Sequence, residues 1–134
     1  MEYKFLIEEA KKHLRYSYAP YSNIHVAAAI LTDQGSIYYG VNVENSSYGL
    51  TICAERNAVA SMVSNGERKP IAIAIVTDLE HPIPPCGACR QVLAEFNPGI
   101  TIVMHSVKSG ETSVVKLSDI FKDPFLLRST EKED

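Results

Sequence analysis

Hydrophobic positions recur with a helical period near the start of the chain. The stripe is mostly apolar and consists of Phe5, Leu6, Glu9, Ala10, His13 and Leu14. Side chains at this spacing share one face of a helix, so the pattern predicts a helix over residues 2–16. The polar, proline-containing segment 17–22 follows and is expected to end that helix.

Continuous apolar runs, many of them β-branched, predict the strands. The predicted strands cover residues 26–32, 37–43, 71–77, 100–105 and 112–116. A turn signal, Asp-Gln-Gly-Ser, occupies residues 33–36 between the first two runs. These two strands are therefore expected to form a hairpin.

Two further helices are predicted between the strands. The alanine-rich segment 53–64 is followed by Asn65-Gly66, a helix stop, and the segment 86–96 ends before Asn-Pro-Gly. A short final turn is predicted over residues 117–121. Helices that alternate with strands predict an α/β fold, in which helices cover both faces of a central mixed sheet.

Length and composition fit a single globular domain. Of the 134 residues, 46% are hydrophobic and 22% are charged. We expect one domain over residues 1–127 and a polar tail over residues 128–134. The net charge is −3, without the excess of basic residues that is typical of nucleic-acid-binding proteins. Long nucleic acids are therefore not expected partners. Because no segment resembles a signal peptide or a membrane span, we expect no membrane association and a cytoplasmic location.

The chain has three cysteines, which fall into two clusters. Cys53 precedes Glu55 in Cys-Ala-Glu, and Cys86 and Cys89 belong to Pro-Cys-Gly-Ala-Cys. A structural zinc site normally has four protein ligands, whereas a hydrolytic site has three and leaves a position for water. Three cysteines beside a glutamate therefore indicate a catalytic zinc site. Glu55 is the candidate that moves the proton of the activated water.

Both clusters stand at the starts of predicted helices. Cys53 and Glu55 would lie about 200° apart around a regular helix, so they cannot both face a metal from its middle. We therefore predict that Cys53 caps its helix and that Glu55 lies in the first turn. Two helix N-termini would offset the negative charge of three thiolates. Arg56 and Arg90 are expected to assist by donating hydrogen bonds to sulfur.

Two other interpretations of the cysteines stay open. Cys86 and Cys89 are also compatible with small apolar residues of a core. A histidine as fourth ligand would make the zinc site structural instead of catalytic. The candidates for such a ligand are His13, His25, His81 and His105. None of them stands at a ligand spacing from the cysteines.

Longer motifs around the cysteines resemble the small homotetrameric cytidine deaminases. These motifs are Asn42-Val43-Glu44-Asn45-Ser46-Ser47-Tyr48-Gly49, Thr51-Ile52-Cys53-Ala54-Glu55-Arg56 and Pro-Cys-Gly-Ala-Cys-Arg-Gln-Val-Leu-Ala-Glu-Phe over residues 85–96. Cys-x-Glu followed by Pro-Cys-x-x-Cys also matches the signature of zinc deaminases, in which the glutamate is an acid/base and not a ligand. The similarity extends from the opening helix to about Phe125. It implies a three-layer α/β/α sandwich around a five-stranded sheet.

The resemblance also implies a role for each motif residue. Cys53, Cys86 and Cys89 would hold one zinc ion per subunit, and Glu55 would shuttle protons. Asn42 and Glu44 would grip the ribose hydroxyls. The other substrate-binding residues that it implies are Val43, Asn45, Ser46, Ser47, Tyr48, Ala54 and Phe125. In such enzymes the loop that contains Tyr48 completes the pocket partly across a subunit boundary, and Phe125 would extend toward a neighbour's base.

The residues themselves leave the role of Asn42 and Glu44 open. They alternate along the end of a predicted strand, so their side chains are expected to share one face and to engage a polar sugar together. A solvated strand edge would have the same pattern, because exposed Asn and Glu are common.

Three positions depart from the family's pattern. Ile24 stands where many relatives have phenylalanine in the base pocket, and His25 and Ala27 replace a common proline and glycine. Loss of the aromatic ring is expected to weaken stacking on the pyrimidine by ~1 kcal/mol. These departures bear on the range of substrates.

The expected reaction is the hydrolytic deamination of cytidine and deoxycytidine to uridine and deoxyuridine, a step of pyrimidine salvage. Zinc-activated water would attack C4 of the base, while Glu55 protonates N3 and then carries a proton to the departing ammonia. One alternative is a zinc deaminase that acts on another nucleoside or a nucleoside antibiotic. The more distant alternative is a non-enzymatic zinc-binding module. Glu44 favours a free nucleoside, because its carboxylate would repel a nearby phosphate.

Overall fold

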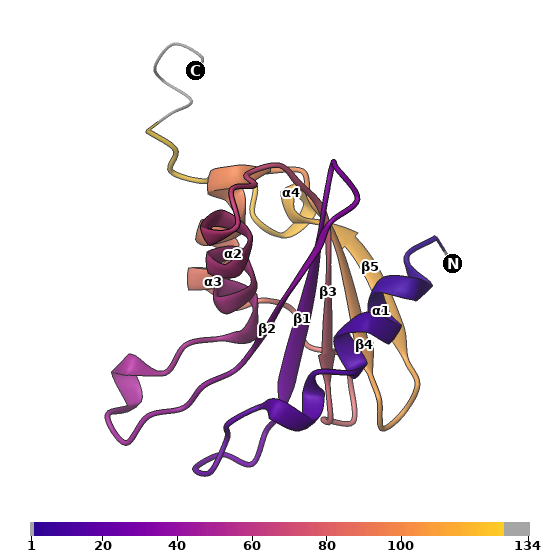
Figure 1. The fold of residues 1–134 in the computed structure, drawn as a ribbon, viewed down its shortest axis with the longest axis vertical. Coiled ribbons are helices and arrows are strands. Elements are labelled where there is room, and N and C mark those ends of the chain that lie inside the picture. Colours follow the sequence, from indigo (N-terminus) through magenta and orange to yellow (C-terminus); the bar gives the residue numbers. More distant parts are fainter. Residues whose placement is uncertain (1, 128–134) are drawn as a thin grey trace.

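The computed structural model describes residues 2–127, so the tail expected over residues 128–134 lies outside the described part (Figure 1). The helices are α1 (Lys4–Lys11), α2 (Ala54–Ser64), α3 (Gly87–Phe96) and α4 (Leu117–Ile120), with 3-10 turns η1 (Leu14–Tyr16) and η2 (Tyr48–Leu50). The strands are β1 (Val26–Thr32), β2 (Ile37–Val41), β3 (Pro70–Thr77), β4 (Thr101–Ser106) and β5 (Thr112–Lys116). No helix of the described residues is long and apolar enough to cross a membrane.

The five strands form one mixed sheet in the order β2-β1-β3-β4-β5. Only β3 and β4 run parallel to each other, and the chain passes between them through α3. The other neighbouring pairs are antiparallel. The hairpin predicted for the first two strands is present, with Ala29 of β1 opposite Tyr39 of β2.

Helices cover both faces of the sheet (Figure 1). α1 lies on one face, and α2 and α3 lie side by side on the other. The architecture is therefore the expected three-layer α/β/α sandwich around a five-stranded mixed sheet. Because α2 and α3 share a face, their N-terminal ends can contribute to one site.

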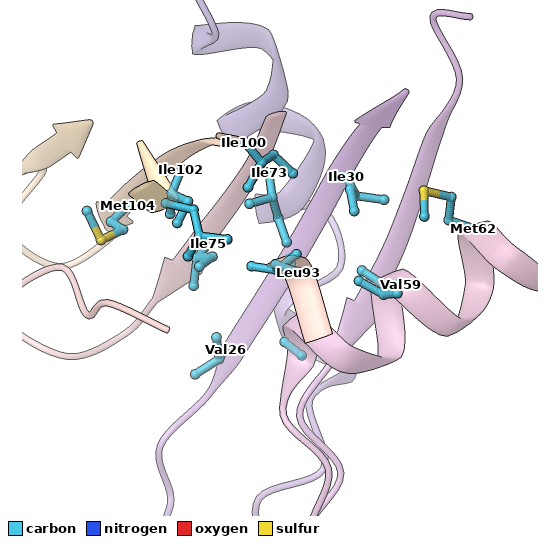
Figure 2. Packing of buried hydrophobic residues seen from close by; sticks show 14 of the residues in the cluster. Val26, Ile30, Val59, Met62, Ile73, Ile75, Leu93, Ile100, Ile102 and Met104 are labelled. Atoms are coloured by element: carbon cyan, nitrogen blue, oxygen red, sulfur yellow. The ribbon is translucent and has the colours of Figure 1, made fainter. Parts of the chain in front are cut away.

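Side chains that alternate along the central strands supply the two halves of the core. Toward α2 and α3 the strands present large residues, among them Ile30 and Ile73, which pack with Met62 and Leu93 of the helices (Figure 2). Toward α1 the strands present mostly alanines, namely Ala27, Ala29, Ala72 and Ala74. Small side chains on that face let α1 lie close to the sheet and bury Leu6 completely.

Two predicted elements are shorter in the structure. The helix expected over residues 2–16 ends at Lys11, and a separate 3-10 turn follows. There the ring of His13 stacks on Tyr39 of β2 at 3.9 Å between centroids, a tertiary contact that helical periodicity cannot reveal. The strand expected over residues 37–43 ends at Val41, because Val43 leaves the sheet and pairs with Tyr18 and Ile52.

Candidate metal centre and substrate pocket

The three cysteine sulfurs meet where the N-termini of α2 and α3 come together. Cys53 is the N-cap of α2, Cys86 is the N-cap of α3, and Cys89 lies in the first turn of α3. The Sγ atoms of Cys53 and Cys86 are 3.9 Å apart, and those of Cys86 and Cys89 are 3.5 Å apart. A tetrahedral zinc ion with Zn–S bonds of about 2.3 Å requires a sulfur–sulfur spacing of about 3.8 Å. The donor set therefore fits zinc.

Within residues 2–127, no fourth protein ligand joins this cluster. Among the described residues, the three cysteines form the group whose ligand atoms lie within 4.8 Å of one another, with no histidine in it. The histidines have other partners: His13 stacks on Tyr39, His25 contacts Asp78, His81 contacts Glu111 and His105 contacts Thr112. This arrangement speaks against a structural zinc site with a histidine ligand, and it leaves one coordination position for water.

Glu55 lies in the first turn of α2, directly after the cap. The predicted arrangement of Cys53 and Glu55 is thereby confirmed. Glu55 is only 5% exposed, and its burial raises its pKa to about 7. A carboxyl group with such a pKa can both accept and donate a proton near neutral pH.

The electrostatics of the cluster favour an ionised sulfur at Cys53, whereas hydrogen bonding with Cys53 and burial raise the pKa of Cys89. Hydrogen bonding with the Cys89 thiol, followed by that with Arg56, lowers the pKa of Cys53 to about 5. Nη2 of Arg56 lies 3.9 Å from the Cys53 sulfur and 3.3 Å from the carbonyl oxygen of Thr51. Arg56 therefore links the sulfur to the segment that precedes it.

Arg90 differs from the expectation that it would bond to sulfur. Its Nε donates to the carbonyl oxygen of Pro85 at 2.8 Å, and its Nη1 donates to that of Ile120 at 2.7 Å. The carbonyl group of Pro85 lies outside regular structure and that of Ile120 stands at the C-terminal end of α4, so both need a donor, and Arg90 supplies it. The residue thus holds the segment before Cys86 against the end of α4.

Two adjoining hollows open beside the cluster. The first has a volume of about 180 Å³, and its walls are Val26, Asn42, Thr51, Cys53, Ala54, Glu55, Ile83, Pro84 and Cys86. The second has a volume of about 370 Å³, and its walls are Tyr21, Ser22, Glu44, Tyr48 and Thr51. Thr51 belongs to both, so the two hollows meet there. We call the first the metal-side hollow and the second the polar hollow. The metal-side hollow can take a flat ring, and the polar hollow can take a hydroxylated group.

Asn42 and Glu44 line different hollows and do not share a strand face. Both follow the end of β2, where the chain has left the sheet. Asn42 is 9% exposed and lies in the metal-side hollow, whereas Glu44 lies in the polar hollow. Hydrogen bonds from Ser22 and Tyr21 lower the pKa of Glu44, with the Ser22 hydroxyl as the largest contribution. Neither residue is a freely solvated edge group.

The loop that follows Glu44 is held by hydrogen bonds within itself and by one to Tyr21. Asn45 donates its backbone N–H to Oγ1 of Thr51 and accepts that of Ser47 at Oδ1. Ser46 Oγ lies 2.7 Å from the hydroxyl oxygen of Tyr21. Tyr48, at the loop's tip, is 76% exposed.

The remaining site candidates lie at different depths. Ala54 is fully buried and forms part of the metal-side hollow, whereas Val43 is half exposed and pairs through its backbone with Ile52. Phe125 is 71% exposed, and its carbonyl oxygen accepts a hydrogen bond from Gln91. The Phe125 ring therefore does not cover the hollows of its own chain.

The residues that depart from the family's pattern have clear partners here. Ile24 packs against the core on the α2 and α3 side. Nδ1 of His25 lies 2.7 Å from a carboxylate oxygen of Asp78, and Ala27 is completely buried in β1.

Sequence reasoning missed Thr51, Ile83 and Pro84 as walls of the site. Thr51 stands two residues before Cys53, and this proximity is the signal that could have identified it. Ile83 and Pro84 precede Cys86 in a segment without periodicity. Their place opposite Cys53 depends on how α2 and α3 pack together, which local pattern does not reveal.

Comparison with known proteins agrees with this geometry. Residues 1–105 match the family model of the cytidine and deoxycytidylate deaminase zinc-binding region. A cytidine deaminase of Halalkalibacterium halodurans is 44% identical over 125 residues, which are 93% of this chain and 95% of the relative. A cytidine deaminase of Sporosarcina psychrophila is 48% identical over 120 residues, which are 87% of this chain and 88% of the relative.

A solved structure has the same fold. The crystal structure of cytidine deaminase from Burkholderia pseudomallei superposes with a TM-score of 0.88 at 44% sequence identity, over 93% of this chain and 100% of that one. The family match, the near end-to-end relatives and the cluster of three cysteines agree with one another. The chain belongs to the cytidine and deoxycytidylate deaminase family of zinc-binding proteins.

Proposed function

We propose that the protein catalyses the hydrolytic deamination of cytidine and deoxycytidine to uridine and deoxyuridine, a step of pyrimidine salvage. The observation that carries the proposal is the buried Glu55, which shares one hollow with Cys53 and Cys86. A zinc-binding module without enzymatic activity needs neither an open coordination position nor a buried acid/base group beside it. The two relatives named above, 44% and 48% identical to this chain, are cytidine deaminases.

The chemistry divides between the metal and Glu55. Zinc held by Cys53, Cys86 and Cys89, one ion per subunit, supplies the activation of the attacking water. The Glu55 carboxylate accepts a proton from that water and delivers it to N3 of the base. It then moves a second proton to the amino group at C4, which leaves as ammonia. Water and cytidine thus yield uridine and ammonia.

The polar hollow is assigned to the sugar. Glu44 lines this hollow, and Asn42 lines the metal-side hollow that meets it at Thr51, so both can offer hydrogen-bonding groups to sugar hydroxyls. The carboxylate of Glu44 would repel a phosphate group. A free nucleoside is therefore the favoured substrate over a nucleotide.

We also propose that the protein is a homo-oligomer, with a homotetramer as the expected form. Large apolar side chains are exposed on the segments beside the polar hollow: Tyr18, Val43, Tyr48, Leu50 and Ile52. Backbone pairing between Tyr18, Val43 and Ile52 keeps these segments together. A clustered apolar surface of this kind is typical of a protein interface. Tyr48 and Phe125 would then contribute to the pocket of a neighbouring subunit.

The cytoplasm is the proposed location. The three cysteines are free thiols, and a reducing compartment keeps thiols available for zinc.

A substrate panel tests the proposed function. Zinc-loaded protein is mixed with cytidine, deoxycytidine or cytidine monophosphate, and both ultraviolet absorbance and released ammonia are followed. We expect the spectra of the two nucleosides to be lost with one ammonia per molecule, and the nucleotide to react much more slowly. Zinc-loaded protein that releases no ammonia from either nucleoside would contradict the proposal.

A further inference from the structure

The carboxylate of Glu44 is held on both of its oxygen atoms. Oε1 accepts the backbone N–H groups of Tyr21 at 2.9 Å and of Ser22 at 3.1 Å. Oε2 accepts the hydroxyl of Ser22. Because each carboxylate oxygen has two acceptor positions, three of the four are filled, and one position on Oε2 is left.

The direction of the Ser22 hydroxyl is itself fixed. Its oxygen accepts the backbone N–H of Ile24 at 3.0 Å, so its hydrogen is directed at Glu44. The turn that carries Ser22 is closed by the N–H of Asn23, which donates to the carbonyl oxygen of Ala19 at 3.0 Å. Asn23 has a φ of 60°, a left-handed conformation that asparagine tolerates better than most residues. A defined turn therefore presents the hydroxyl.

Asn42 is fixed in a different way. Its Oδ1 accepts the backbone N–H of Val26 at 3.0 Å and the hydroxyl of Ser17, and its Nδ2 donates to the carbonyl oxygen of Ile24 at 2.8 Å. Two main-chain groups thus orient the Asn42 amide in addition to the hydroxyl of Ser17. For Glu44, in contrast, Oε2 is the oxygen with a position left for a ligand, and it accepts a hydrogen bond from one side chain, that of Ser22.

We propose that Ser22 is a positioning residue that orients the Glu44 carboxylate toward a sugar hydroxyl, and so sets how strongly the protein selects nucleosides that carry that hydroxyl. This inference rests on the proposed function. Ser22 and Glu44 both line the polar hollow, whereas Glu55, Cys53 and Cys86 line the metal-side hollow. Loss of the Ser22 hydroxyl is therefore expected to weaken substrate binding and to leave the chemical step nearly intact.

The test compares two substrates in two proteins. Zinc-loaded wild type and Ser22→Ala are assayed with cytidine and with 2′,3′-dideoxycytidine, which lacks both ring hydroxyls. For Ser22→Ala, we expect the KM for cytidine to rise about tenfold, because a hydrogen bond to a charged group is lost. The kcat for cytidine and the KM for dideoxycytidine are expected to change by less than about twofold. Zinc content is expected to stay at one ion per chain.

Two further variants separate positioning from folding. Ser22→Thr keeps the hydroxyl and is expected to return the KM for cytidine to within about threefold of wild type. Ser64→Ala is the matched control, because Ser64 is an exposed serine at the end of α2 whose hydroxyl bonds to the carbonyl oxygen of Ser61. Ser22 is also exposed, so its replacement by alanine is not expected to prevent folding.

The outcomes distinguish a failure of the inference about Ser22 from a failure of the proposed function. Suppose that wild type deaminates cytidine, but that Ser22→Ala changes the KM of both substrates by the same factor or changes neither KM. The inference is then overturned, and the proposed function stands. If wild type releases no ammonia from cytidine, the proposed function is overturned and the inference falls with it.

Discussion

Single backbone positions determine where the chemical groups of the site lie. Cys53 and Cys86 are caps with extended backbone, so their sulfurs lie off the helix ends and not along the helix sides. Glu55 comes within the first turn and is buried. The chain thereby places ligands and acid/base group around one point, although a regular helix would separate them.

Replacing Glu55 by alanine tests its role as the acid/base group. We expect kcat to fall by roughly 10²- to 10⁴-fold, because the proton transfers lose their carrier. Zinc content is expected to stay the same, since Glu55 is not a ligand. Turnover by steady-state kinetics and zinc by metal analysis give the two readouts, with exposed Glu8→Ala as the control. Near-normal turnover in Glu55→Ala would contradict the assignment.

Gly40 of β2 controls how closely α2 approaches the sheet. A Cβ atom at this position would lie 2.3 Å from the carbonyl oxygen of Ala54 and 2.4 Å from the backbone nitrogen of Ala58. Both are main-chain atoms of α2, so neither can move aside without moving the helix. That helix carries Cys53 and Glu55 at its start.

Replacing Gly40 by alanine should therefore destabilise the fold and loosen the zinc site. We expect a loss of about 1–3 kcal/mol in the free energy of unfolding, the usual cost of overpacking, and weaker zinc binding. Denaturant unfolding and zinc titration measure these two effects. Gly99→Ala is the control, because a Cβ there meets only the Asn97 side chain at 3.8 Å. Equal stability of the two variants would disprove the role of Gly40.

At the scale of elements, the sequence predicts the main strands and helices because the burial pattern follows local periodicity. Strand β1 is buried along its whole length and reads as a continuous apolar run. The two failures, at the end of α1 and the end of β2, have tertiary causes. His13 stacks on Tyr39, and Val43 pairs with Tyr18 and Ile52, contacts between segments distant in sequence.

In the candidate site, too, local sequence pattern predicts some features and tertiary packing determines the others. The positions of Cys53 and Glu55 followed from helix geometry alone. The bonds of Arg90 to Pro85 and Ile120 did not, because α4 meets α3 only in the folded chain. For Thr51, nearness to Cys53 in the sequence hints at the site, but its place between two hollows is a property of the packed loops.

Neighbouring residues of α2 provide a test of how the helix is packed. Met62 is fully buried against the sheet (Figure 2). Its neighbour Val63 is 37% exposed. We expect Met62→Ala to cost about 2–5 kcal/mol in the free energy of unfolding, because a cavity is left in the core. Val63→Ala is expected to change it by less than about 0.5 kcal/mol. Urea unfolding of zinc-loaded wild type and both variants, at one fixed protein concentration, makes the comparison. A similar loss in the free energy of unfolding for both variants would contradict the packing.

At the scale of the whole molecule, the proposed pocket of one chain is open. The polar hollow is bordered by Tyr48, which is largely exposed, and Phe125 lies away from it. An oligomer would close the hollow and cover the apolar side chains beside it. The proposed assembly and the proposed activity are therefore linked.

Introducing a charge at Leu50 tests this link. Leu50 is 65% exposed, so Leu50→Asp is expected to leave the subunit folded and its zinc site intact. We expect light scattering to show a smaller assembly, and cytidine turnover to fall, because a buried unpaired charge disfavours the interface. Val107→Asp, at an exposed turn after β4, is the control. A wild-type protein that is a stable, active monomer would contradict the shared pocket.

Zinc titration of metal-free protein, with cytidine turnover measured at each step, tests the central claim most directly. The claim is that one zinc ion on three cysteines, with Glu55 beside it, performs the deamination. The account predicts that metal-free protein is inactive, and that activity rises in proportion to bound zinc and levels off at one ion per chain. Full turnover without zinc, or one bound zinc per chain without turnover, would contradict it.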